Sequence, residues 1–244
     1  MGTTIFVAAG GSRLTVIVGR STRRYWPRYI CRLETGIVSN FKRIVMESFI
    51  ETIKVLNGQF CNLDAHERRA KATAKAFFGK SLAWEVGGMV VPTEMCSGVV
   101  KCRVVYDSEV REVCFQPYVM RRIGSLRLVN GDGVDYRYKS TNRSVLARLL
   151  EQRGACDDVL IVRDGWITDT SFTNVVFEDA GGGLYTPDTC LLEGTRRQSL
   201  LDVGRIQARP IRVEDIGHFQ RVLLVNAMIG LEDAIRVPVV NIMK

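Results

Sequence analysis

Histidine is scarce in this chain, with two among 244 residues, at His66 and His218. Two imidazoles so far apart in the sequence offer no His-rich metal site, so we expect no bound metal. Several catalytic motifs are also missing: a Gly-x-Ser-x-Gly elbow, a Gly-x-Gly-x-x-Gly after a strand, a Walker loop and a His-Glu-x-x-His helix. The sequence therefore gives no support for the enzyme classes that these motifs identify.

Cysteine pairs with metal-binding or redox spacing are missing as well. The seven cysteines are odd in number and scattered, and none forms a Cys-x-x-Cys pair. The chain shows no clear signal peptide, and no apolar run approaches the roughly 20 residues that span a bilayer. We therefore expect reduced thiols in a cytoplasmic protein that does not enter a membrane. The cysteines are Cys31, Cys61, Cys96, Cys102, Cys114, Cys156 and Cys190.

An excess of basic residues is confined to one end of the chain. The net charge is +8, yet residues 1–45 contain eight basic side chains and one acid, whereas the rest contains 26 basic and 25 acidic ones. Because the body is nearly neutral, we expect it to bind no nucleic acid.

The basic leader, residues 1–45, is open to three interpretations. An Arg-rich, acid-poor leader is typical of a transit peptide. Its apolar runs at 5–9 and 14–18 could instead form a short hairpin packed on the body. The third interpretation, which we favour, is that Met46 is the true start, because charge balance and residue pattern both change there.

Clear secondary-structure signals begin after this leader. Residues 49–55 alternate and are rich in β-branched side chains, which indicates a strand. The dipeptide Asn57-Gly58 predicts a hairpin turn and a short return strand. Asp64 is then expected to cap a helix over 65–78, which Gly79 ends in a left-handed conformation.

The pattern predicts an α+β fold of two domains. Three further segments read as successive antiparallel strands, at 98–106, 112–117 and 125–129. The glycine-rich joint at 130–133 separates a smaller domain, 46–130, from a larger one, 131–244. In the larger domain we expect helices over 142–152 and 195–203 and strands over 158–163, 166–168, 174–178, 184–186 and 222–226.

Three features of the larger domain fit a pyridoxal phosphate site, which needs an amine, an acid for the ring nitrogen and amides for the phosphate. Lys139 is one of eight lysines, against 26 arginines, and lies before a predicted helix, where lost hydration would lower its pKa. Asp169 follows a hairpin among small polar residues. Gly194 precedes a helix whose first N–H groups are free to bind an anion.

Each of these signals alone also fits an ordinary role. Lys139 could be a surface lysine, and Asp169 a turn or capping residue. His66 and Arg69 share one face of the first helix. His66 could be a packing histidine, and Arg69 either a solvated arginine or a phosphate anchor.

The order and spacing of these residues resemble the class IV aminotransferases, a pyridoxal phosphate family. The matching runs are residues 66–69, 167–174 and 194–197, and the resemblance covers roughly residues 49–240. It implies a two-domain α+β fold with the cofactor at the domain interface. It also implies a homodimer that acts on a small amino substrate.

The resemblance assigns roles residue by residue. Lys139 would bond the cofactor's aldehyde and serve as the catalytic base. The other implied cofactor-binding residues are Arg69 for the phosphate, Asp169 for the pyridine nitrogen with Asn174 in the same segment, and the backbone amides of Thr195 and Arg196 for the phosphate. Thr52 and Asn226 are implied as further active-site residues.

Within the family, two runs favour a lyase over a transaminase. Residues 139–143 resemble a Lys-x-x-Asn-Arg run, and residues 226–228 resemble an Asn-Ala-Leu/Met run, both typical of 4-amino-4-deoxychorismate lyases. The implied reaction gives 4-aminobenzoate and pyruvate for folate synthesis. An aminotransferase for D- or branched-chain amino acids is the alternative. An inactive or regulatory relative is a further one, because Asp169 is one methylene shorter than the family's usual glutamate.

Overall fold

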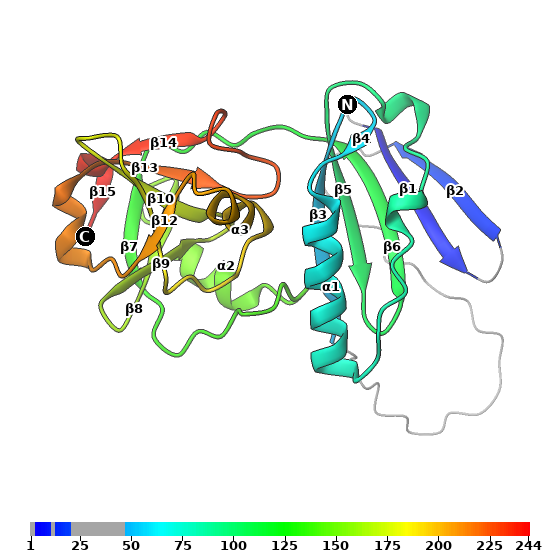
Figure 1. The fold of residues 1–244 in the computed structure, drawn as a ribbon, viewed down its shortest axis with the longest axis horizontal. Helices are drawn as coiled ribbons and strands as arrows, with labels where there is room; N and C mark the ends of the chain where they lie inside the picture. Colours follow the sequence, from blue (N-terminus) through cyan, green and yellow to red (C-terminus); the bar gives the residue numbers. More distant parts are fainter. Residues whose placement is uncertain (1–2, 11–12, 21–46) are drawn as a thin grey trace.

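The chain forms two lobes, each built on its own β-sheet (Figure 1). This computed structural model describes residues 3–10, 13–20 and 47–244. Much of the predicted basic leader, together with the proposed start at Met46, lies outside the described residues. No helix in the described part of the chain is long and apolar enough to cross a membrane.

The smaller lobe is a six-stranded antiparallel sheet in the order β2-β1-β6-β5-β3-β4. The turn between β3 and β4 has positive φ at Asn57 (48°) and Gly58 (81°), which confirms the predicted hairpin. The strands are β1 (Thr3–Gly10), β2 (Arg13–Arg20), β3 (Phe49–Leu56), β4 (Gln59–Phe60), β5 (Val99–Tyr106) and β6 (Val110–Pro117).

Helix α1 (Leu63–Phe78) covers one face of this sheet (Figure 1). Gly79 ends it with φ 66°, as predicted. The predicted cap, Asp64, is wrong, because the capping position is Asn62 and Asp64 lies in the first turn. The Asn62 side chain makes no capping bond; its Nδ2 instead donates to the Thr195 carbonyl oxygen at 3.2 Å, in the other lobe.

Burial alternates strictly along β5. The inward residues Val100, Cys102 and Val104 pack in the core beneath α1, together with Ile53 of β3. The outward residues of β5 include the basic side chains Lys101 and Arg103, on the opposite face of this sheet. Between α1 and β5 the chain makes two short 3-10 turns, η1 (Val86–Gly88) and η2 (Thr93–Met95).

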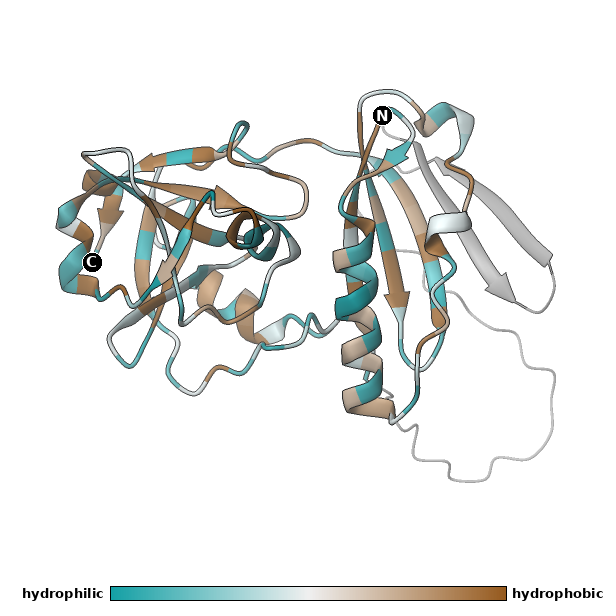
Figure 2. Ribbon diagram, viewed as in Figure 1, coloured by the Kyte–Doolittle hydropathy of each residue, from teal (hydrophilic) through white to brown (hydrophobic). Residues whose placement is uncertain are grey.

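The larger lobe is a mixed sheet of nine strands. Seven run in the order β12-β11-β10-β9-β8-β7-β15, and β13 pairs with both β10 and β14. Hydrophobic residues recur along the strands of both lobes (Figure 2). The elements are β7 (Leu126–Asn130), α2 (Ser144–Glu151), β8 (Asp158–Arg163), β9 (Trp166–Thr170), β10 (Asn174–Asp179), β11 (Leu184–Pro187), α3 (Thr195–Asp202), β12 (Gln207–Arg209), η3 (Val213–His218), β13 (Phe219–Val225), β14 (Ile235–Pro238), η4 (Val239–Asn241) and β15 (Ile242–Met243).

Strand β7 differs from its prediction. The sequence pattern placed it third in an antiparallel set, but it pairs parallel to β8 and to β15 in the second sheet. Leu126 is fully buried there, in the core of the larger lobe. The sheets therefore divide between β6 and β7, earlier in the chain than the predicted boundary after residue 130.

The lobes are joined beside Lys139. The Ile50 N–H of β3 donates to the Lys139 carbonyl oxygen at 2.9 Å, and the Thr141 N–H donates to the Ser48 carbonyl oxygen at 2.9 Å. Phe49 and Ser140 form an isolated antiparallel bridge. The backbone on both sides of Lys139 is thus fixed by the smaller lobe, although the lysine belongs to the segment that leads into the larger one.

Candidate active site

A cavity lies where the two lobes meet, and residues of both lobes line it. Seven of the eight predicted site residues are on its wall, and Arg196 is the exception. The lining consists of Thr52, Arg69, Tyr136, Lys139, Arg143, Leu146, Asp169, Thr170, Ser171, Phe172, Thr173, Asn174, Leu191, Leu192, Gly194, Thr195, Asn226 and Ala227.

Lys139 has an unusually acidic ammonium group. Burial lowers its pKa to about 7, and the positive charges of Arg69 and Arg143 act in the same direction, against the attraction of Glu51. A large fraction of the side chain is therefore a neutral amine at neutral pH. A neutral amine is the form that attacks an aldehyde.

Asp169 lies on β9, directly opposite Asn174 of β10. Its Oδ1 accepts a hydrogen bond from Asn174 Nδ2 at 2.8 Å, and its Oδ2 accepts from the Leu191 and Leu192 N–H groups at 2.9 and 3.0 Å. Burial raises its pKa to about 6, against the effect of these three bonds. The carboxyl is ionised at neutral pH and held in one orientation, partly by Asn174.

The N-terminus of α3 faces the same cavity. Gly194 is the capping residue, and a Cβ there would collide with Asn174 Oδ1. The first N–H groups of a helix have no partner within the helix and attract anions. Arg196 follows Thr195 in this first turn, and its Nε is buried without a hydrogen-bond partner among the described residues.

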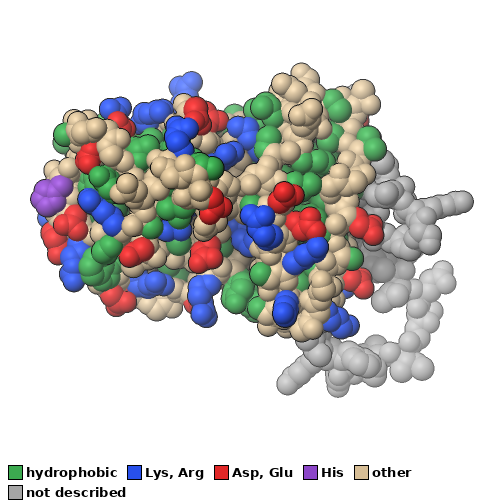
Figure 3. All heavy atoms as spheres, in the orientation of Figure 1, with side chains coloured by type: hydrophobic (Ala, Val, Ile, Leu, Met, Phe, Trp, Pro, Cys, Tyr) green, Lys and Arg blue, Asp and Glu red, His purple; other side chains and the backbone are tan. Residues whose placement is uncertain are grey.

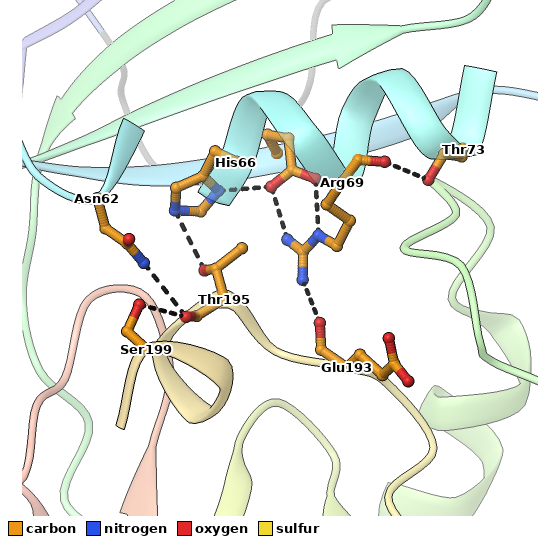
Figure 4. Close-up of polar contacts among 8 residues, drawn as sticks. Asn62, His66, Arg69, Thr73, Glu193, Thr195 and Ser199 are labelled. Atoms are coloured by element: carbon orange, nitrogen blue, oxygen red, sulfur yellow. Dashed lines mark hydrogen bonds and ion pairs between the residues drawn. The ribbon is translucent and has the colours of Figure 1, made fainter. Parts of the chain in front are cut away.

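Arg69 and His66, which Figure 4 labels on α1, both hold the buried carboxylate of Glu51. Glu51 Oε1 accepts from Arg69 Nε at 2.9 Å, while Oε2 lies 2.6 Å from both Arg69 NH2 and His66 Nδ1. Burial would raise the pKa of Glu51. The charge of Arg69 and the bonds from both partners outweigh it and lower the pKa to about 2.

The same two residues reach across to the larger lobe (Figure 4). Arg69 NH1 donates to the Glu193 carbonyl oxygen at 3.1 Å, and His66 Nε2 lies 3.3 Å from Thr195 Oγ1. Burial lowers the pKa of His66, so at neutral pH it is a neutral link between Glu51 and Thr195. Three of the five N–H donors of the Arg69 guanidinium are thus used, and two remain on a side chain that lines the cavity.

The sequence motifs do not identify Glu51, which holds both Arg69 and His66. Positions 49, 51, 53 and 55 share the inward face of β3, and all but Glu51 are apolar. The sequence signal for Glu51 is an acid in this apolar row. Only the short strand β4 separates its strand from the helix that carries His66 and Arg69.

Thr52 and Asn226 both lie on the cavity wall, as does Phe172. Thr52 belongs to β3, and Asn226 follows β13. Asn226 Nδ2 donates to the Phe172 carbonyl oxygen at 3.3 Å, and its Oδ1 accepts from the Met228 N–H at 2.8 Å. Asn226 thus shapes the turn after β13 and fixes it to the loop that carries Phe172.

The chain is similar to known proteins in sequence and in fold. The family model described as amino-transferase class IV matches residues 107–235. An uncharacterized protein of Haemophilus influenzae is 34% identical over 189 residues, which is 76% of this chain and 100% of that protein. The structure of a proposed 4-amino-4-deoxychorismate lyase from Haemophilus somnus is 32% identical, covers 76% of this chain and 98% of that chain, and has a TM-score of 0.68. A hypothetical aminotransferase from Mycobacterium tuberculosis in its pyridoxal phosphate-bound form shares the fold at 19% identity, covers 84% of this chain and 86% of that chain, and has a TM-score of 0.59.

The residues of the cavity fit pyridoxal phosphate. Lys139 supplies a neutral amine for the aldehyde, and Asp169 supplies an oriented carboxylate for a protonated ring nitrogen. Arg69 has two free N–H groups and the N-terminus of α3 has unpaired amides, both suited to a phosphate. A negative charge would therefore face the protonated ring nitrogen, and a positive charge would face the phosphate.

Glu51 should stabilise the fold through its ion pair. Glu51→Gln should lower the free energy of unfolding at pH 7 by about 3 to 5 kcal/mol, because it leaves a buried Arg69 without its anion. Glu67→Gln on α1, the helix that carries Arg69, breaks a more exposed pair with Lys71 and should cost less than about 1 kcal/mol. Urea unfolding measures both changes. Equal losses of stability in the two variants would contradict the stabilising role of the Glu51 ion pair.

The pKa of Glu51 also predicts a pH dependence. The folded pKa of about 2 is below the ordinary glutamate value of 4.5, so the stabilisation is complete above pH 4.5 and is lost as the pH falls to 2. The shift corresponds to roughly 3 kcal/mol. The difference in stability between wild type and Glu51→Gln should shrink across this window in acid-titrated urea unfolding. A constant difference would exclude the charge as its cause.

The pKa of Lys139 predicts how fast the apoprotein takes up its cofactor. The rate constant with pyridoxal phosphate should fall about tenfold per pH unit below pH 7, where the ammonium form dominates, and should level off above it. Stopped-flow absorbance measures this rate. A rate that keeps rising towards pH 10, as for an exposed lysine, would exclude a desolvated amine.

Proposed function

The chain belongs to the class IV aminotransferases, and from that premise we propose that it is a lyase that converts 4-amino-4-deoxychorismate to 4-aminobenzoate and pyruvate. It is a pyridoxal phosphate-dependent enzyme, as the family match indicates. The observation that carries the lyase proposal is the 32% identity to a proposed 4-amino-4-deoxychorismate lyase, over 98% of that chain.

The two lyase-like runs support the proposal because they act on one wall of the cavity. Arg143 of the first run donates from NH2 to the Ser171 carbonyl oxygen at 2.6 Å. Asn226 of the second run donates to the next carbonyl oxygen, that of Phe172. Two segments far apart in the sequence thus hold the same loop, which lines the space beside Lys139.

Lys139 is suited to move the protons of this reaction. Pyridoxal phosphate supplies an electron sink for the carbon that bears the substrate's nitrogen. Lys139, with a pKa of about 7, would take the proton from that ring carbon. The electrons then form the new ring double bond as the carbon–oxygen bond to the enolpyruvyl group breaks, and Lys139 returns a proton to the departing group.

Asp169 would act on the ring nitrogen without transferring a proton to the substrate. Its pKa of about 6 keeps it ionised at neutral pH, so it would hold a protonated pyridine nitrogen. Asn174 and the two backbone N–H groups fix its oxygens. The aspartate is shorter than the family's usual glutamate, and these bonds set where its carboxylate stands.

We also propose that the enzyme is a cytoplasmic homodimer in folate synthesis. Chorismate-derived 4-aminobenzoate is a building block of folate, which supports the pathway. The cysteines of the described residues are free thiols, as is usual for cytoplasmic proteins. The dimer is proposed from the family alone.

The proposal is tested by incubating the holoenzyme with 4-amino-4-deoxychorismate and, separately, with D-alanine. We expect 4-aminobenzoate by fluorescence and pyruvate in equal amounts, and no pyridoxamine phosphate from D-alanine. Lys139→Ala should lose the visible absorbance of the bound cofactor and its turnover. Accumulation of pyridoxamine phosphate without 4-aminobenzoate would show that the enzyme is an aminotransferase and not a lyase. Retained absorbance of the bound cofactor in Lys139→Ala would exclude Lys139 as the residue that bonds the cofactor.

A further inference from the structure

A second hollow opens from the cofactor cavity. The two share Thr52, Lys139, Arg143, Phe172, Asn226 and Ala227 on their walls. The residues that line the second hollow alone are Lys101, Gln116, Pro117, Tyr118, Val119, Arg121 and Met228. It therefore extends from Lys139 along the outer face of β5 to the segment that connects the lobes.

The lining of this hollow is strongly one-sided in charge. It contains Lys101, Arg121 and Arg143, together with the largely neutral Lys139, and no aspartate or glutamate. On the face of the molecule that Figure 3 shows, acidic and basic side chains are interspersed. A concave wall of one charge sign concentrates ions of the opposite sign.

Lys101 is distinguished from its neighbours on the same sheet face. It pairs across the strands with Lys54, and Arg103 lies two residues further along β5. Lys54 has an acid partner, Asp233, at 3.4 Å, and Arg103 has one, Glu112, at 3.6 Å. Lys101 has no hydrogen-bond or ion-pair partner within the part of the chain that the structure describes.

Arg121 reaches the hollow from the connection between β6 and β7. Its guanidinium carbon stands 4.9 Å from the centroid of the Phe172 ring, which positions the group without neutralising it. No acid pairs with it among residues 47–244. Burial lowers the pKa of Lys101, and the nearby charges of Arg103 and Arg121 lower it further. A bound anion would relieve this repulsion.

We infer that Lys101 and Arg121 bind a carboxylate of the substrate, at the end of the hollow away from the cofactor. The inference rests on the proposed function. 4-Amino-4-deoxychorismate carries a ring carboxylate across the ring from its amine. With the amine at Lys139, which lines both spaces, the ring carboxylate would extend into the second hollow, where Lys101 and Arg121 are the cations that line that hollow alone. Lys101 and Arg121 thus select a substrate with an acid opposite its amine.

Paired ligands test the site directly. The holoenzyme is titrated with 4-aminobenzoate and with 4-aminobenzamide, which differ in charge and little in shape. Wild type should bind the acid at least about tenfold more tightly, as expected for charge-assisted hydrogen bonds. Lys101→Gln and Arg121→Gln should each weaken the binding of 4-aminobenzoate about tenfold and leave the binding of 4-aminobenzamide unchanged. Both should raise KM for 4-amino-4-deoxychorismate more than they lower kcat.

The matched control is Arg103→Gln, which removes the same charge from the same sheet face but lies outside the hollow. It should leave both dissociation constants unchanged. Equal binding of acid and amide by wild type, or equal weakening by Lys101→Gln and Arg103→Gln, overturns the site. An unchanged cofactor spectrum in each variant shows that it is folded. If wild type forms no 4-aminobenzoate but the charge-dependent binding and its loss are observed, the lyase proposal fails and the carboxylate site stands.

Discussion

The buried carboxylate of Glu51 is the interaction on which the geometry of the site depends. It is fully inaccessible to solvent, and a charge so placed is tolerated because Arg69 and His66 both bond to it. The same two residues then extend to Glu193 and Thr195 at the start of α3. One anion in the smaller lobe thereby ties the start of α3 in the larger lobe to the smaller lobe, at the cavity between them.

Burial also sets the chemistry of the site, and its effect depends on the partners of each group. Glu51 has the cation Arg69 and a hydrogen bond from His66 as partners, and its pKa falls to about 2. Asp169 is held only by neutral donors, so burial prevails and its pKa rises to about 6. Lys139 has cations as near neighbours, and its pKa falls to about 7. An inert anion, an ionised acid and a neutral amine thus lie side by side at neutral pH.

The sequence predicted those parts of the molecule that depend on local chemistry. Asn57-Gly58 specified a turn, Gly79 a helix end, and the order of Lys139, Asp169 and Gly194 a shared site that the fold places on one cavity wall. It could not predict features set by distant partners. Strand β7 pairs parallel to β8 because its side chains fill the core of the larger lobe. The cap of α1 is Asn62, whose side chain is drawn to Thr195 across the interface. Glu51 looked like one acid in a strand until its two partners were placed opposite it.

The central claim is that Lys139 is the amine that holds the cofactor. The most direct measurement is borohydride reduction of the holoenzyme, followed by proteolysis and mass spectrometry of the peptides. Reduction makes the bond between lysine and cofactor permanent. We expect one phosphopyridoxyl group per chain, on the peptide that contains Lys139. A label on another lysine, or one spread over several, would contradict it.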